Sequence, residues 1–455
     1  MTRDDAMTPI ELSATEAARQ LREGELSAED MVTACLERID EIDGEVQAWA
    51  HLDPDFALEQ ARARDAQRQA GDPLGPLHGV PVGIKDIFDT EGLPTENGTP
   101  LDSGRQPDRD CKAVSLLKEA GAVIMGKTVT TELAVYGPGK THNPHNPDHT
   151  PGGSSSGSAA AVATGMVPLA IGSQTNGSII RPASYCGVVG FKPSHGLIPR
   201  TGVLAQSRYL DTIGVMARSV EDAALCAEAL VAHDPGDADT APRGRPPMAK
   251  IAAEDPPLPP TLAFAKTAVW DQADKETQEA FGELKELLGE ECDDLDLPDP
   301  FDHAVEWLRT IMYADLAKSF AGYYERGKDQ LTNTLCEMIE EGQKTTAVEY
   351  NRAVDWRDVL NVGLEKVFER YDAIFTPATT GEAPAGLDST GNPVFCTLWT
   401  YCGTPAITLP LMEGPNGLPL GVQLVGRRGD DARLLRTANW LTGHIAGADE
   451  RSGTV

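Results

Sequence analysis

The stretch Gly152-Gly-Ser-Ser-Ser-Gly-Ser-Ala-Ala-Ala-Val-Ala-Thr-Gly-Met-Val-Pro-Leu-Ala-Ile-Gly-Ser-Gln-Thr-Asn-Gly-Ser178 places two loops rich in glycine and serine around an alanine-rich run and a short apolar run. A glycine and serine linker would be polar throughout, whereas these serines flank segments apolar enough to be buried. The order predicts a loop, a helix, a strand and a second loop. Because glycine has no side chain, backbone N–H groups of such loops can converge on an anion. We therefore interpret the stretch as the floor of an active site.

The flanking sequence alternates between strand and helix patterns, which favours a sheet with helices on its faces. Apolar runs predict strands at 79–89, 122–129, 187–192, 262–266, 373–378, 406–411 and 420–426. Helical spacing predicts helices at 113–120, 219–231 and 431–445, with a largely helical block at 272–371. We therefore predict the α/β class, as a single large α/β/α sandwich with a central mixed sheet flanked by helices, plus a helical insertion.

We expect one domain over residues 1–455, because this length supports a large core. Its predicted parts are N-terminal helices at 1–75, a core at 76–232, a flexible connection with the helical insertion at 233–371, and a return to the sheet with a C-terminal helix at 372–455. The N-terminal helices begin at Ser13 and Ser27, since each serine precedes an acidic residue by three positions.

The charge and cysteine content limit the classes of partner. The chain has 70 acidic against 39 basic residues and a net charge of −31, so its surface repels phosphate backbones and we expect no nucleic-acid partner. Its 8 cysteines lack the spacing of metal or redox motifs, which is typical of reduced thiols. No signal-peptide core and no apolar stretch of roughly 18 residues is found, so we expect a cytoplasmic protein without membrane contact.

Two polar features need a separate interpretation. Lys85 lies in the middle of a predicted buried strand, where a charged side chain needs an explanation. Either it is functional, or it pairs with Asp86 or Asp89, or its side chain extends so that the amine reaches the edge. His142, His145 and His149 lie in a proline-rich loop. No carboxylate or cysteine completes a recognisable ligand pattern there, so we expect no metal.

Three sets of residues compete for the nucleophile. Gly153–Gly157 fits the pattern G-x-S-x-G with Ser155 as nucleophile, but that motif follows a buried strand, and a proline-rich loop precedes it here. A Ser/His/Asp triad is the second possibility, with His78 or His195 as its histidine, although neither lies in a diagnostic motif. The third set combines one lysine with two serines, namely Lys85, Ser154 and Ser178.

The third set is carried by three motifs, Gly79-Val-Pro-Val-Gly-Ile-Lys-Asp, Gly152-Gly-Ser-Ser-Ser-Gly-Ser-Ala-Ala-Ala and Gly172-Ser-Gln-Thr-Asn-Gly-Ser-Ile-Ile-Arg-Pro-Ala. Together they closely resemble the amidase signature family of serine hydrolases. The resemblance covers most of the chain, because Asp211-Thr-Ile-Gly-Val-Met-Ala and Gly417-Leu-Pro-Leu-Gly-Val-Gln also match later landmarks of that family. Ser154 and Ser178 are 24 residues apart, the spacing of its two catalytic serines.

The resemblance implies a nucleophile at Ser178, a proton relay at Ser154 in a cis peptide bond, and a base at Lys85. A lysine acts as a base only when neutral, which burial favours. The resemblance also implies an oxyanion hole formed by the backbone N–H groups of Thr175, Asn176, Gly177 and Ser178, and it requires no metal or cofactor. Two departures affect the pocket: the family usually has glycine at Asn176 and an arginine two residues after the nucleophile, whereas Arg181 is three after it.

We expect hydrolysis of the C–N bond of a small amide or carbamate (urethane) through an acyl-enzyme, with esterase activity also open, by a monomer or homodimer. Phe88, Tyr136, Gly153 and Trp399 are the expected substrate-binding residues. Two alternatives remain: a protein like the amidase component of tRNA-dependent amidotransferases, working in a complex, and a catalytically inactive binding protein. The net charge and the lack of an acidic residue in Phe395–Pro405 favour the small-molecule enzyme over the amidotransferase component.

Overall fold

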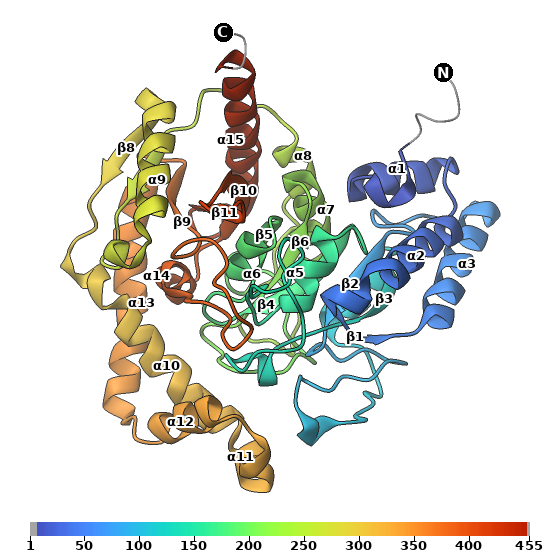
Figure 1. Ribbon diagram of the computed structural model, residues 1–455, viewed down its shortest axis with the longest axis horizontal. Helices are drawn as coiled ribbons and strands as arrows, with labels where there is room; N and C mark the ends of the chain where they lie inside the picture. The colour runs from blue at the N-terminus through green and yellow to red at the C-terminus, as the bar shows by residue number, and fades with distance from the viewer. Residues whose placement is uncertain (1–6, 453–455) are drawn as a thin grey trace.

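Eleven strands form one sheet in the computed structural model, which describes residues 7–452 (Figure 1). They are β1 (Trp49–Leu52), β2 (Pro81–Lys85), β3 (Val123–Thr128), β4 (Leu169–Gln174), β5 (Val189–Lys192), β6 (Thr212–Ala217), β7 (Leu262–Ala265), β8 (Cys292–Leu295), β9 (Ala373–Pro377), β10 (Ala406–Glu413) and β11 (Pro419–Val425). Their order across the sheet is β1-β3-β2-β4-β6-β5-β10-β11-β9-β7-β8.

The sheet is mixed, as predicted. β2 pairs in parallel with β3 and β4, and β7 pairs in parallel with β8 and β9, whereas the central strands pair antiparallel. Three strands were not predicted, namely β1, β6 and β8. The histidine in Trp-Ala-His-Leu of β1 and the two aspartates in Cys-Asp-Asp-Leu of β8 interrupt any apolar run, whereas the equally short β5 and β7 lie in apolar runs and were predicted.

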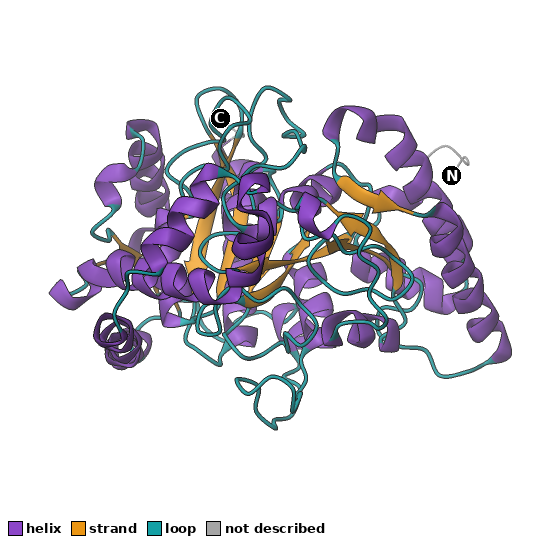
Figure 2. Ribbon diagram, turned by 90° about the horizontal axis from the view of Figure 1, so that it is seen from below, coloured by secondary structure: helices purple, strands orange, loops and turns teal. Residues whose placement is uncertain are grey.

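Helices cover both faces of this sheet (Figure 2), which confirms the predicted α/β/α sandwich. They are α1 (Ala14–Glu23), α2 (Ala28–Val46), α3 (Pro54–Ala70), α4 (Lys112–Glu119), α5 (Ser156–Ala163), α6 (Ile180–Tyr185), α7 (Val220–Leu230), α8 (Met248–Ala252), α9 (Lys275–Leu288), α10 (Ala304–Ser319), α11 (Ala321–Gly327), α12 (Asn333–Gly342), α13 (Ala347–Phe368), α14 (Val394–Cys402) and α15 (Asp431–Ser452). The predicted caps are confirmed, since Ser13 accepts from the N–H of Glu16 and Ser27 from that of Asp30. Among the residues described, no helix has the length and apolar character that a membrane crossing needs.

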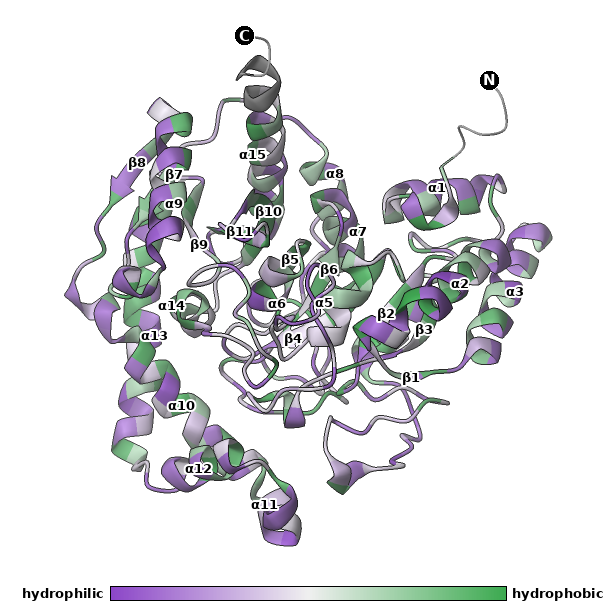
Figure 3. Ribbon diagram, in the orientation of Figure 1, coloured by the Kyte–Doolittle hydropathy of each residue, from purple (hydrophilic) through white to green (hydrophobic). Residues whose placement is uncertain are grey.

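The apolar side chains form two main clusters. The larger one joins the sheet to α2, α5, α7 and α15. The second lies between the helical insertion α10–α13, helix α14 and strands β7 and β9 of the sheet. Figure 3 shows green and purple bands alternating on outer helices such as α9, whose apolar side faces the core. The insertion therefore packs on the sheet through this second core, which also contains Ile180, two residues after Ser178.

The serine-rich stretch folds as predicted, into a loop, helix α5, strand β4 and a second loop. Helix α5 lies unusually close to the backbone beneath it. A Cβ atom at Gly157 would come within 2.1 Å of the carbonyl oxygen of Ala48, and one at Gly172 within 2.6 Å of the hydroxyl of Ser155. Small residues are therefore required on both sides of this contact, which holds the two serine-rich loops at the same edge of the sheet.

Candidate active site

Lys85 is the last residue of β2, and all five residues of that strand are buried. Its side-chain nitrogen donates hydrogen bonds to the hydroxyl oxygens of Ser154 at 2.7 Å and Ser173 at 2.9 Å. Ser154 lies in the first serine-rich loop, and Ser173 lies on β4, which pairs in parallel with β2. The structure thus brings Lys85 and Ser154 together, as the sequence analysis expected.

Burial without a counter-ion sets the charge of this lysine. Within residues 7–452, no carboxylate lies in ion-pair distance of Lys85; Asp86 pairs instead with Lys127, and Asp89 pairs with Arg105. The alternative in which Lys85 pairs with Asp86 or Asp89 is therefore wrong. Burial lowers the pKa of Lys85 well below its usual value, and the negative charge of Asp211 opposes this shift only in part.

The Gly153–Ser154 peptide bond is cis, as the resemblance implies. Its flanking backbone is held on two sides. The guanidinium of Arg181 donates to the carbonyl oxygen of Gly153 at 2.7 Å, and the carbonyl oxygen of Ser154 accepts from the N–H of Thr131 at 3.2 Å. Ser154 itself is buried, so only a group already inside the protein can exchange a proton with it.

The loop from Thr175 to Ser178 connects β4 to α6. In the part of the chain that the structure describes, none of its four backbone N–H groups donates a hydrogen bond to another protein group. Unpartnered N–H groups are rare in protein interiors, and successive N–H groups that point to one side can bind an anion. The loop ends at Ser178, which is half-buried. The N–H groups of this loop are therefore available to bind a negatively charged oxygen beside the hydroxyl of Ser178.

The hydroxyl groups of Ser154 and Ser178 are not hydrogen-bonded to each other in the described structure, in contrast to Lys85 and Ser154. Only the first of the two proton-transfer contacts that the resemblance implies is formed. Catalytic hydrogen bonds commonly tighten only when substrate is bound. The role of Ser178 as the nucleophile therefore stays a prediction.

Asn176, one of the departures from the family pattern, has its side chain bridged to two other elements. Its amide nitrogen donates to the hydroxyl of Tyr136 at 3.1 Å, and its amide oxygen accepts from Thr397 on α14 at 2.8 Å. It is not among the described non-glycine residues with positive φ. Asn176 therefore stands at this position because its amide joins the loop to Tyr136 and α14.

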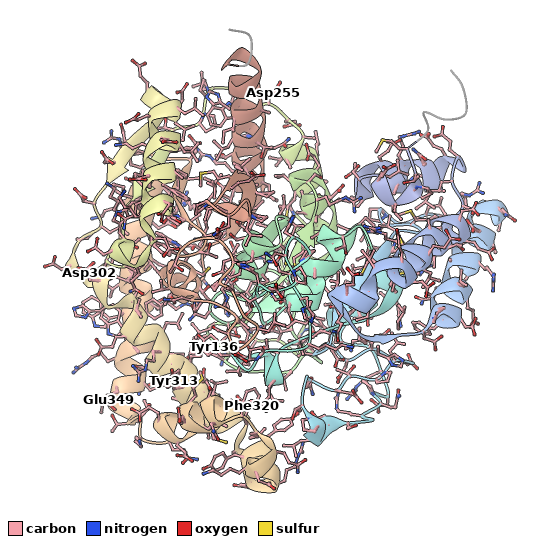
Figure 4. All side chains as sticks on the ribbon, viewed as in Figure 1. Tyr136, Asp255, Asp302, Tyr313, Phe320 and Glu349 are labelled. Carbon is pink, nitrogen blue, oxygen red and sulfur yellow. The ribbon has the colours of Figure 1, made fainter. Side chains whose placement is uncertain are left out.

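The four expected substrate-binding residues lie in different environments. Tyr136 is half-buried and packs against the second apolar cluster, near Tyr313 and Phe320 of the insertion (Figure 4). Trp399 is 1% exposed within that cluster, and Phe88 is fully buried in the larger one. Gly153 contributes its carbonyl oxygen to Arg181. Contact of these residues with a substrate stays a prediction.

A cavity of about 420 Å³ opens beside Ser173 and Thr175. Its walls come from β4, from the segments 200–213 and 236–239, and from the end of α10. Asp211, in its wall, accepts hydrogen bonds from Thr175 at 2.7 Å and from two backbone N–H groups. The volume is in the range of small-molecule sites.

The competing sites expected from sequence take structural roles. Ser155 is fully buried and donates to the carbonyl of Ser173, and the segment that leads into it is not a strand. A ring nitrogen of His195 contacts the carbonyl oxygen of Arg208, and burial lowers its pKa to about 3. No cluster of metal-ligand side chains occurs among residues 7–452. His142, His145 and His149 instead contact backbone carbonyl groups.

Sequence reasoning missed three hydroxyl groups around the site. They are Ser173, the second partner of Lys85, and the α14 residues Thr397 and Thr400, which contact Asn176. Ser173 carried one usable signal, because it lies in β4, the strand that leads directly into the loop ending at Ser178. The threonines of α14 carried none, since each contact joins residues that are more than 220 positions apart in the chain.

Comparison with known proteins finds similarity over nearly the whole chain. The chain is 33% identical to the A subunit of the glutamyl-tRNA(Gln) amidotransferase of Chloroflexus aurantiacus over 468 residues, covering 94% of this chain and 95% of the relative. Its structure matches that of the peptide amidase of Stenotrophomonas maltophilia with a TM-score of 0.84 and 28% identity, covering 96% and 97% of the two chains. It matches 6-aminohexanoate cyclic dimer hydrolase with a TM-score of 0.85 and 26% identity over the same shares.

The sequence profile of the family described as Amidase matches residues 30–435. This range contains β2, both serine-rich loops and the helical insertion, so it includes every group of the site described above. The chain is therefore a member of the amidase signature family of hydrolases.

Proposed function

We propose that the protein hydrolyses the C–N bond of a small amide or carbamate through an acyl-enzyme on Ser178. The neutral amine of Lys85 accepts a proton from Ser154, and Ser154 accepts one from Ser178 as its oxygen attacks the carbonyl carbon. The C–N bond then breaks, and the proton returns through Ser154 to the leaving nitrogen. Water hydrolyses the resulting ester by the same route and releases the acid.

The observation that carries this proposal is the Lys85–Ser154 hydrogen bond of 2.7 Å in a fully buried setting. A serine hydroxyl needs a base within hydrogen-bond reach to become a nucleophile. Burial holds the pKa of Lys85 well below its usual value, so the amine is available as a base nearer neutral pH than that of an exposed lysine.

The loop before Ser178 supports acyl transfer in particular. Four backbone N–H groups without protein partners lead to that hydroxyl in the described structure. Such groups stabilise the negatively charged oxygen of a tetrahedral intermediate, and each donor contributes about 3–4 kcal/mol in enzymes where this was measured. The cavity of about 420 Å³ that begins at Thr175 supports a small-molecule substrate.

A fluorophosphonate probe followed by peptide mass spectrometry tests the proposal. We expect an adduct on Ser178, its loss in Ser178→Ala, and turnover of at least one member of a panel of aryl amides, aliphatic amides, esters and carbamates. A folded protein without an adduct would contradict the proposal and support an inactive binding protein. The panel also separates amidase from esterase and urethanase activity.

A second candidate function is that of the amidase component of a tRNA-dependent amidotransferase, because the sequence relative in Chloroflexus carries such a name at 33% identity over nearly its whole length. The net charge of −31 weighs against this candidate, because an acidic surface repels the negatively charged phosphate backbone of tRNA. Glutamine hydrolysis that depends on co-purified partner proteins would favour this candidate. Turnover of small amides by the purified chain alone would favour the first.

A further inference from the structure

Thr400 is a buried threonine of α14 whose hydroxyl donates to the backbone carbonyl oxygen of Asn176 at 2.5 Å. Asn176 belongs to the loop with the unpartnered N–H groups, and its carbonyl forms one peptide unit with the N–H of Gly177. The hydrogen bond therefore fixes the plane of the peptide unit that ends one residue before Ser178.

The direction of this peptide unit follows from elementary geometry. A trans peptide is planar, and its C=O and N–H bonds point in opposite directions. The only cis bond in the described structure is Gly153–Ser154, so the Asn176–Gly177 peptide is trans. Because its carbonyl points to Thr400, the N–H of Gly177 points away from that hydroxyl.

We propose that Thr400 is a positioning residue that keeps the N–H of Gly177 aimed at the developing oxyanion. Without its hydroxyl the peptide can rotate, because no other side chain in the described structure donates to that carbonyl. A rotated peptide would present a carbonyl oxygen in place of the N–H, which repels the oxyanion. This inference rests on the proposed function and adds a residue that acts on the oxyanion hole from a distant helix.

The side chain of Gln174, the residue before the loop, connects the hydroxyl of Thr400 to the backbone that follows Ser178. Its amide nitrogen donates to Thr400 at 2.9 Å, while its amide oxygen accepts from the N–H groups of Ile179 at 2.9 Å and Ile180 at 3.0 Å. The hydroxyl of Thr400 therefore has a fixed acceptor and a fixed donor, so its proton points to Asn176. A hydroxyl oriented in this way cannot turn to an alternative partner.

Close packing of α14 on the loop makes the contact specific. A Cβ atom at Gly177 would come within 2.8 Å of Pro393 and 3.3 Å of the sulfur of Cys396. The loop and the start of α14 are thus in contact, and a threonine one turn after Cys396 is at the right height to reach the carbonyl.

The test compares three variants by kcat, KM and the rate of fluorophosphonate labelling of Ser178. Thr400→Val keeps the shape and removes the donor, so kcat and labelling should fall about 10- to 100-fold, with KM within about threefold. Thr400→Ser keeps the hydroxyl and should restore most of the rate. Thr404→Val is the matched control, because Thr404 is also buried and donates to a carbonyl of α14, at 3.1 Å, but not to the loop. Its kcat should stay within about twofold of the wild type.

The outcomes separate this inference from the proposed function. If wild-type Ser178 is labelled and Thr400→Val reacts at the wild-type rate, the role of Thr400 is refuted while the proposed function stands. If Thr400→Ser is as slow as Thr400→Val, or Thr404→Val loses as much, packing and not the hydroxyl is responsible, and the inference is again refuted. If Ser178 of the wild type is not labelled, the proposed function is refuted, and the role of Thr400 that rests on it is refuted with it.

Discussion

The side-chain nitrogen of Lys127 lies 3.2 Å from a carboxylate oxygen of Asp86, with side chains only 0% and 5% exposed. Lys127 lies on β3, and its neighbour across the strand pair is Ile84, the residue before Lys85. The same amine also donates to the carbonyl of Phe88 and the hydroxyl of Thr95. This ion pair neutralises the carboxylate next to Lys85 in the chain, and Lys85 is left among hydroxyl groups.

Replacing Asp86 by asparagine should destabilise the fold. The substitution leaves Lys127 buried without its counter-charge, which costs about 3–5 kcal/mol in comparable buried pairs. Urea unfolding of Asp86→Asn measures this loss in the free energy of unfolding. The double variant Asp86→Asn/Lys127→Met should recover much of it, because no charge is then left unpaired. An unfolding midpoint equal to that of the wild type would show that the pair does not stabilise this region.

Removing the hydroxyl of Ser178 should abolish turnover and leave the fold intact. Ser178 is half-buried and its hydroxyl has no hydrogen-bond partner in the described structure, so Ser178→Ala should change stability by no more than about 0.5 kcal/mol. Steady-state kinetics and thermal unfolding check the two halves of this prediction. Ser155→Ala is the matched control and should keep the label on Ser178. Labelling that moves to another serine would contradict the assignment of the nucleophile.

The bridge between Tyr136 and Asn176 should affect substrate binding. Tyr136→Phe removes the acceptor of the Asn176 amide, which should lower the free energy of unfolding by about 0.5–1.5 kcal/mol, the usual net contribution of one hydrogen bond. Because Tyr136 is an expected substrate-binding residue, we also expect KM to rise for the best amide of the panel, with kcat little changed. A fall in kcat at constant KM would instead assign the bridge to the transition state.

The sequence predicted the parts of the fold that depend on local pattern. Apolar runs identified β2, β4 and β11, and serines before acidic residues identified the starts of α1 and α2, because these signals act within one element. β1 and β8 escaped because their sequences, Trp-Ala-His-Leu and Cys-Asp-Asp-Leu, lack an apolar run, whereas the equally short β5 and β7 have one and were predicted. The pairing partners of β1 and β8 supply the hydrogen bonds that define them as strands.

The site was predictable to the extent that motifs carry it. Lys85, Ser154 and the loop ending at Ser178 came from the resemblance, and the contact of Lys85 with Ser154 agrees with it. The contacts of Thr397 and Thr400 with Asn176 were not predictable, because they depend on how α14 docks onto a loop more than 220 residues earlier. Asn176 departs from the family pattern, and only its two tertiary partners explain the choice.

The pH dependence of catalysis should depend on Lys85. Activity should rise with pH as the amine loses its proton, and the midpoint should lie below the usual lysine value, because burial lowers the pKa of Lys85. Lys85→Met should reduce kcat about 10²- to 10⁴-fold and remove this rise. A profile of kcat/KM for the wild type across about pH 5 to 10 measures the midpoint. A flat wild-type profile would contradict a lysine base.

Lys85 should also make the stability of the fold depend on pH. Between its lowered pKa and 10.5, the unfolded chain holds a proton at residue 85 that the folded chain has released, so the free energy of unfolding rises with pH across this window. Lys85→Met has no proton to lose on folding. Its free energy of unfolding should therefore exceed that of the wild type by the largest amount below the lowered pKa, and this difference should shrink towards pH 10.5. Burial also lowers the pKa of Lys127, and that of Lys192 to about 7, so both proteins gain stability with pH and only their difference isolates Lys85. Urea unfolding at a series of pH values gives that difference. A constant value would mean that residue 85 holds its proton equally in both states, and the amine could then not be the base.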